Sequence, residues 1–261
     1  MKVAMMQPAF LPWLGFFELI SKVERFVFLD DFQFSVQSYH QRNRFFASPG
    51  KVDWQTVPVL KGVSFGAPLN HTQIAELTPW RKKMWKKIIQ NYAKAPFFHE
   101  MSRELEAWCL EPAVSLAAQN IAFIRMACKW MGIECEYRLS SNRESNLKRS
   151  ERVLDLLRWS ETDCYYCARG SFGYMKADGI FPVGDIRVFF QDFHPQPYLQ
   201  VGSPGIFYPN LSVLDVLSNV GSKMTGDMLR TGTAKWASWD EMLAVTNSAS
   251  PTGNVSDAIQ G

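Results

Sequence analysis

The chain has 261 residues, of which 47% are hydrophobic and 14% aromatic, and its net charge is +3. This length allows one sizeable core, and so mild a charge does not suggest a nucleic-acid-binding protein, which needs many cationic contacts to phosphates. No apolar run reaches the roughly 18 residues that cross a bilayer, and Gln7-Pro8 interrupts the apolar start too early for a signal peptide. We therefore expect a cytoplasmic protein that is not an integral membrane protein.

The first 31 residues predict a strand, a helix and a second strand. Residues 2–6 are an apolar run that ends at Gln7-Pro8, and residues 13–23 have apolar side chains at helical spacing after Pro12. Residues 25–29 are a second apolar run, ended by Asp30-Asp31. Strand, helix and strand within about 30 residues are typical of a βαβ unit in a parallel sheet.

The rest of the chain continues this alternation. Further strands are predicted at 52–59, 133–137, 162–167 and 186–190, and helices at 80–92, 98–109, 113–131 and 150–159, with a short helix from Ser212 that has Asp215 as its capping-box partner. The pattern predicts an α/β fold with a mostly parallel, Rossmann-like central sheet, helices on both faces and a helical C-terminal part. We expect one domain over 1–245, with 78–131 as the place for a helical subdomain, and a flexible tail over 246–261.

Polar residues follow the first two predicted strands, where open parallel sheets bind their ligands. Gln7 follows the first strand, and Asp30, Asp31 and Gln33 follow the second. The two carboxylates would point to opposite sides if the strand continued, so one of them would face a ligand as a base, a cation ligand or a partner of a sugar hydroxyl. The helix start after Gln7 would also suit a phosphate. The alternative interpretation is a pair of solvated residues at a strand end.

Three further groups are candidates for a site. Arg42-Asn43-Arg44 carries two guanidiniums that can grip phosphate or carboxylate, although an ordinary strand edge has the same pattern. Arg169 and Ser171 lie in a glycine-containing loop after a strand, where they can contact an anion. His71, in a polar loop, is a candidate acid or base.

The sequence names no cofactor and no metal site. It has no P-loop and no GxGxxG motif, and its 4 histidines have no metal-ligand spacing. Among the 5 cysteines, Cys164 and Cys167 have the spacing of a redox or zinc motif, but no second pair completes a zinc set. The apolar run around them favours structural cysteines in a buried strand.

Three segments together resemble the opening of the WbqC-like protein family: Met6-Gln7-Pro8-x-Phe10-x-Pro12-Trp13-x-Gly15-Phe16, Phe26-Val27-Phe28-Leu29-Asp30-Asp31-Phe32-Gln33-Phe34, and Arg42-Asn43-Arg44. Phe207-x-Pro209-x-Leu211-Ser212-Val213-Leu214-Asp215 is similar to that family's C-terminal motif, so the resemblance runs from Met1 to about Trp239. It implies a link to bacterial O-antigen and other surface-polysaccharide genes, and hence a nucleotide-linked or carrier-linked sugar or acyl substrate. It supplies no established catalytic residue.

The enzyme hypothesis is a transferase that places an acyl or aminoacyl group on an activated amino sugar. Asp31 or His71 would be the general base, Gln7 and Gln33 would orient the substrate, and the arginines would bind its anionic part. A nucleotidyltransferase-like enzyme is an alternative, although its usual His-x-Gly-His is absent. The other alternative is a non-catalytic assembly protein that binds a pathway enzyme, with the basic helix face Arg81, Lys82, Lys83, Lys86 and Lys87 as its partner surface.

Overall fold

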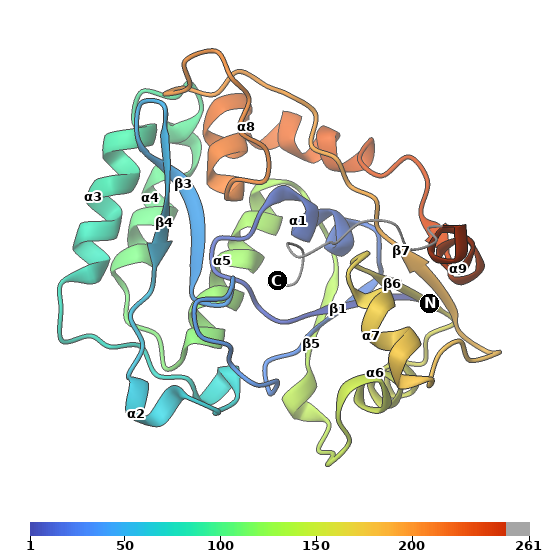
Figure 1. Ribbon diagram of the computed structural model, residues 1–261. Helices are drawn as coiled ribbons and strands as arrows, with labels where there is room; N and C mark the ends of the chain where they lie inside the picture. Colours follow the sequence, from blue (N-terminus) through green and yellow to red (C-terminus); the bar gives the residue numbers. More distant parts are fainter. Residues whose placement is uncertain (249–261) are drawn as a thin grey trace.

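The computed structural model describes residues 1–248, and a six-stranded sheet of order β5-β2-β1-β6-β7-β8 forms its centre (Figure 1). Its strands are β1 (Lys2–Met6), β2 (Arg25–Phe28), β5 (Glu136–Leu139), β6 (Cys164–Cys167), β7 (Arg187–Phe190) and β8 (Ala237–Ser238). All neighbouring strands are parallel except β7 and β8. Counted along the chain, the parallel strands have the doubly wound order 3-2-1-4-5. The predicted α/β class with a mostly parallel central sheet is confirmed.

Helices cover both faces of this sheet and define two hydrophobic cores. The first core holds α1 (Leu14–Ser21), α5 (Leu116–Trp130) and α8 (Val213–Arg230), and the second holds α6 (Arg149–Trp159), α7 (Ser171–Asp178) and α9 (Trp239–Ser248). Side chains of β6 alternate between them, with Cys164 in the first core and Cys167 in the second. Because the two thiols lie on opposite faces of the sheet, they are buried structural cysteines and not a redox pair.

An insertion between β2 and β5 enlarges the first core. It contains the antiparallel hairpin of β3 (Arg42–Ser48) and β4 (Lys51–Thr56), the short helices α2 (Lys61–Ser64) and η1 (Leu69–His71), and the long helices α3 (Trp80–Tyr92) and α4 (Phe98–Leu110). Side chains of β3, α3 and α4 belong to the same apolar cluster as α1. After β5 the chain makes one more short turn, η2 (Ser140–Asn142).

Among residues 1–248, no helix has both the length and the apolar character needed to cross a membrane. The predicted tail at 246–261 overlaps the end of α9 and otherwise lies outside the described residues.

Two buried asparagines hold the loop that follows β1. Asn43 Nδ2, from β3, donates to the carbonyls of Phe10 (3.2 Å) and Leu11 (2.9 Å). Asn120 Nδ2, from α5, donates to the carbonyls of Pro8 (2.9 Å) and His40 (2.8 Å). Both asparagine side chains are fully buried, so these bonds satisfy carbonyls that water does not reach. The loop is therefore fixed to the hairpin and to the helical layer at once.

The start of α8 differs from the predicted capping box. Ser212 Oγ does accept from the backbone N–H of Leu214 at 3.3 Å, but the backbone N–H of Ser212 donates to the carbonyl of Arg44 and needs no side-chain partner. The Asp215 carboxylate instead accepts from Tyr198 Oη and Gln200 Nε2, both at 2.7 Å. The helix is also longer than predicted and kinks at Gly221 (φ 82°), where the Phe97 ring fills the space of a side chain.

Burial has the largest effect on the pKa of Asp215, a residue that is fully shielded from solvent. Desolvation raises the pKa of this carboxyl to about 6, against the lowering effect of its hydrogen bonds to Tyr198, Gln200 and Tyr92. A carboxyl whose pKa is raised on folding binds its proton more tightly in the native state than in the unfolded state. Native stability is therefore lost as pH rises between about 4 and 6.

We predict that Asp215→Asn removes this loss. From pH 4 to pH 7 the free energy of unfolding of the variant, relative to wild type, should rise by roughly 2 kcal/mol. Urea unfolding at several pH values measures the difference. Asp185→Asn, which alters an exposed loop carboxylate, is the control and should give a difference that does not vary with pH. A flat difference for Asp215→Asn as well would mean that Asp215 titrates normally.

Candidate functional site

The loops that follow β2 and β5 meet because these strands are parallel neighbours. Their polar residues form what we call the strand-end cluster, which consists of Asp30, Asp31, Ser140, Ser141 and Arg152. Ser140 and Ser141 directly follow Leu139, the last residue of β5, and Arg152 comes from α6. Because β2 ends at Phe28, the two aspartates do not alternate across a strand, and both contact Ser140.

Asp30 is the buried member of the pair, with 3% of its surface exposed. Its carboxylate accepts from the backbone N–H of Ser141 (3.0 Å), from Ser141 Oγ (2.7 Å) and from Asn70 Nδ2 (3.5 Å). Asn70 lies in η1, so this carboxylate joins the loops after β2 and β5 to the insertion. With its oxygens bonded inside the protein, Asp30 serves to fix the loops in place.

Asp31 keeps 28% of its side chain exposed. Ser140 Oγ donates to one of its carboxylate oxygens, and the Arg152 guanidinium lies 2.9 Å from the other. That guanidinium, only 4% exposed, also binds Asp155 at 2.9 Å and the Ser140 carbonyl at 2.9 Å. Its position is therefore fixed from several sides. Asp31 is thus an oriented, charge-compensated carboxylate that solvent can reach.

Gln7 and His40 form a second polar pair, at the end of β1. The Gln7 Oε1 oxygen is 3.1 Å from His40 Nε2, and the backbone N–H of Ser35 donates to His40 Nδ1 at 3.4 Å. Nδ1 is then the acceptor, so the proton is on Nε2. Burial lowers the pKa of His40 to about 4, so the ring is neutral at pH 7. Gln7 Nε2 donates to the backbone carbonyl of Gln33, whose side chain is exposed.

Arg169 and Ser171 lie on the other side of β1, after β6. Arg169 is half exposed and already pairs with Asp192 at 2.9 Å. Ser171 begins α7, and its backbone N–H donates to the Ala168 carbonyl. His71 is exposed at the end of η1, next to Asn70, which contacts Asp30. His71 is therefore adjacent in sequence to a residue that contacts the strand-end cluster. Arg169 is already paired with Asp192.

Arg42 and Arg44 project from β3, and both guanidiniums lie over the Trp54 ring. Asn43, between them, faces the interior and has the structural role given above. The three predicted residues therefore separate into one buried anchor and two half-buried cations.

The start of α1 is covered, contrary to the expectation of a phosphate site there. The Trp13 indole lies against Gly15, where an added Cβ would overlap the ring, and Trp13 pairs with Ser212 at the start of α8. Gly15 is thus explained by this ring and not by the approach of a ligand.

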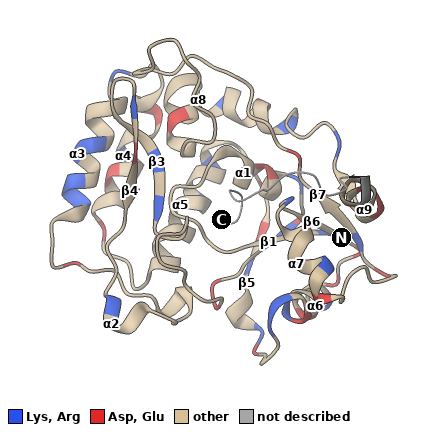
Figure 2. Cartoon of the chain, viewed as in Figure 1, with Lys and Arg blue, Asp and Glu red and all other residues tan. Residues whose placement is uncertain are grey.

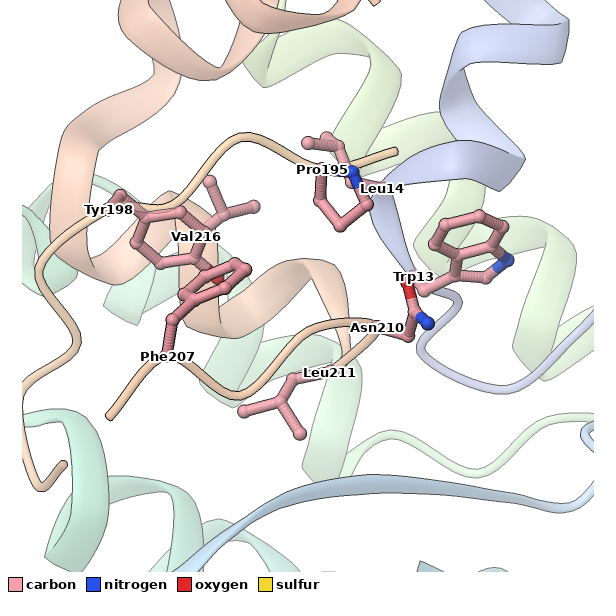
Figure 3. A pocket seen from close by; sticks show the side chains of 8 residues that line it. All are labelled: Trp13, Leu14, Pro195, Tyr198, Phe207, Asn210, Leu211 and Val216. Atoms are coloured by element: carbon pink, nitrogen blue, oxygen red, sulfur yellow. The ribbon is translucent and has the colours of Figure 1, made fainter. Parts of the chain in front are cut away.

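Trp13 also lines a hollow that opens to solvent and encloses a volume of only about 10 Å³ (Figure 3). The other lining residues are Leu14, Pro195, Tyr198, Phe207, Asn210, Leu211 and Val216. Ligand pockets usually have about 300–1,000 Å³, and this hollow contains none of the predicted site residues. It is too small to hold an activated sugar.

The basic face of α3 is smaller than predicted. Figure 2 shows positive charge along this helix, but Arg81 is 6% exposed, and its guanidinium binds the exposed Glu76 and the buried Gln119. Lys87 Nζ donates to Gln55 at 2.9 Å. Within residues 1–248, only Lys82, Lys83 and Lys86 remain as cations without a side-chain partner on the exposed face of α3. The periodicity of the helix misplaced Arg81 because a long side chain can reach into the core while its Cα lies near the surface.

Within the described residues, no group of three or more His, Cys, Asp or Glu side chains is arranged to hold a metal ion. The chemistry that the geometry offers is that of a carboxylate, a neutral imidazole, amides and guanidiniums.

Residues 7–226 match the model of the WbqC-like protein family. The chain belongs to this family. It is also 31% identical over 224 residues to the uncharacterized protein Rv1507c of Mycobacterium tuberculosis, a match that covers 85% of this chain and 95% of the relative. No solved structure matches the chain. The resemblance found in the sequence motifs is therefore confirmed, and the WbqC-like positions Asp31, Asn43 and Asp215 have the contacts described above.

Sequence reasoning missed Ser140, Ser141, Asn70 and Arg152 in this WbqC-like protein. The signal for the two serines was present, since they follow a strand as Asp31 does, but the strand was predicted to end at Tyr137 and it ends at Leu139. Arg152 falls inside the helix predicted over 150–159, and nothing in that pattern sets it apart. Its contact with Asp31 spans 121 residues, and no local pattern reveals such a pair.

We predict that His40→Gln weakens the acid sensitivity of the fold. The unfolded state gains the histidine proton below pH 6.5 and the native state only near pH 4, so wild-type stability falls over this window. The wild type should lose roughly 3 kcal/mol more than the variant between pH 7 and pH 4. Urea unfolding measures this. The exposed His99→Gln should match wild type, and an unchanged slope in His40→Gln would contradict a neutral buried ring.

Proposed function

We propose that this WbqC-like protein is a cytoplasmic transferase of bacterial surface-polysaccharide biosynthesis, which places an acyl or aminoacyl group on an activated amino sugar. The proposal is supported chiefly by Asp31. It is a solvent-accessible carboxylate, oriented by Ser140 and Arg152, at the edge where doubly wound sheets bind their ligands. The pathway in this proposal, surface-polysaccharide biosynthesis, comes from the family resemblance.

The proposed reaction needs one group that accepts a proton. The amine or hydroxyl of the sugar attacks the acyl carbon of the donor, a new C–N or C–O bond forms, and the bond from that carbon to the leaving group breaks. Asp31 takes the proton from the attacking atom, and His71, in the exposed turn beside Asn70, is the second candidate for proton transfer. Gln7 and Gln33 follow β1 and β2 and orient the substrate from the adjacent loops.

Nucleotidyl transfer has less support from the geometry. It would use the start of the first helix to bind phosphates, and here the Trp13 indole and Ser212 cover that helix end.

We predict that Asp31→Asn lowers turnover by about 100-fold or more, the usual contribution of a general base, without weakening substrate binding. Mass spectrometry of mixtures of nucleoside-diphosphate amino sugars with acyl and aminoacyl donors detects the product.

Asp155→Asn is the matched control, because it removes the other carboxylate that binds Arg152 but lies on α6. It should keep near wild-type turnover. If the two variants lose turnover equally, Asp31 acts only through the placement of Arg152, and full turnover in Asp31→Asn would exclude it as the base.

A further inference from the structure

The hairpin of β3 and β4 presents two guanidiniums that lack an anion. Arg42 and Arg44 lie two residues apart on one strand, so both project from the same face. Within residues 1–248 neither guanidinium forms an ion pair or donates a hydrogen bond, and the Nε atom of each is buried without a partner. Arg152 and Arg169, near the strand ends, each pair with a carboxylate.

The Trp54 indole holds both guanidiniums in place. Trp54 lies on β4 directly opposite Arg44, and its ring centroid is 4.2 Å from Cζ of Arg42 and 5.8 Å from Cζ of Arg44. Tyr39 contacts the same indole, with 5.5 Å between ring centroids. A cation–π contact uses the flat face of a guanidinium, whereas its N–H donors lie in the plane around the edge. These contacts hold the guanidiniums beside the indole without an acceptor, so the terminal Nη donors of both arginines stay available to another group.

Two adjacent, half-buried positive charges without a counter-charge are costly to hold together, and an anion that bridges them would remove that cost. We propose that Arg42, Arg44 and Trp54 form a binding site for a diphosphate group. The planar guanidinium of each arginine can donate hydrogen bonds to one phosphoryl group. The two positive charges balance the charge of a diphosphate ester.

The site lies close to the strand-end loops along the chain. Arg42 is two residues from His40, which binds Gln7 at the end of β1, and Asn43 holds the loop after β1. Because Asn43 points toward that loop, Arg42 and Arg44 project from the opposite face of β3, and the group attached to the diphosphate would pass the edge of the hairpin to reach these loops. Only this last step rests on the proposed function. Binding of the diphosphate itself does not.

The first test is isothermal titration calorimetry of the whole chain with inorganic pyrophosphate. Arg42→Gln and Arg44→Gln should each weaken binding by about tenfold, and the double variant by about 100-fold, as expected for lost hydrogen bonds to a charged group. Arg158→Gln is the control, since the side chain of this exposed arginine also lacks a partner among residues 1–248, and it should bind like wild type.

A second variant guards against a folding defect. Arg42→Lys with Arg44→Lys keeps both charges but loses the planar fork, so it should fold as wild type and still bind pyrophosphate several-fold more weakly. Failure of wild type to bind pyrophosphate would overturn the proposal, and so would equal binding by wild type and the lysine variant.

Three ligands identify the source of the diphosphate. A nucleoside-diphosphate sugar, coenzyme A and pyrophosphate are compared in wild type and in the glutamine double variant. Tighter binding of one of the first two names the donor or acceptor that the hairpin takes. If pyrophosphate binds through the arginines but no substrate mixture gives a product, the site stands and the proposed transferase activity fails.

Discussion

The amide groups of Asn43 and Asn120 connect the three parts of the molecule. They donate to the carbonyls of Pro8, Phe10, Leu11 and His40, which the packing of the loop after β1 buries. A buried carbonyl without a donor costs about 1–3 kcal/mol, so a hydrophobic side chain at either position would leave several such groups unsatisfied. The hairpin, helix α5 and the central sheet are joined through this one loop, and the positions of Gln7 and His40 depend on it.

The charged groups near the strand ends have different roles. Asp30 is enclosed and bonded on all sides, and it fixes the loops. Asp31 is its exposed neighbour, and Arg152 supplies the counter-charge that keeps it in place. Arg42 and Arg44 are the exception, because they are held by an aromatic ring instead of a carboxylate. Arginines that a protein pairs internally stabilise its fold, whereas arginines held beside an aromatic ring keep terminal N–H donors for a ligand.

The fold was predictable where burial produces a local hydrophobic pattern in the sequence. β1, β2, β6 and β7 are short apolar runs because a parallel sheet covered on both faces excludes polar residues, and α3 to α5 have clear helical periodicity. β3 was not predicted, since Arg42, Asn43 and Arg44 bring polar side chains to both of its faces and the alternation of a strand is lost. The candidate site was found only where residues follow a strand along the chain. The contacts between Arg152 and Asp31 and between Trp13 and Ser212 join distant segments. No local pattern in a single sequence indicates such contacts.

The distribution of thiols has a practical consequence. Cys109 and Cys128 belong to the first core and Cys167 to the second, and burial raises the pKa of all three thiols. A buried thiol reacts with an alkylating reagent only when its surroundings open. The two helical layers therefore carry separate chemical reporters, and the order in which these cysteines are alkylated would show which face of the sheet loosens first.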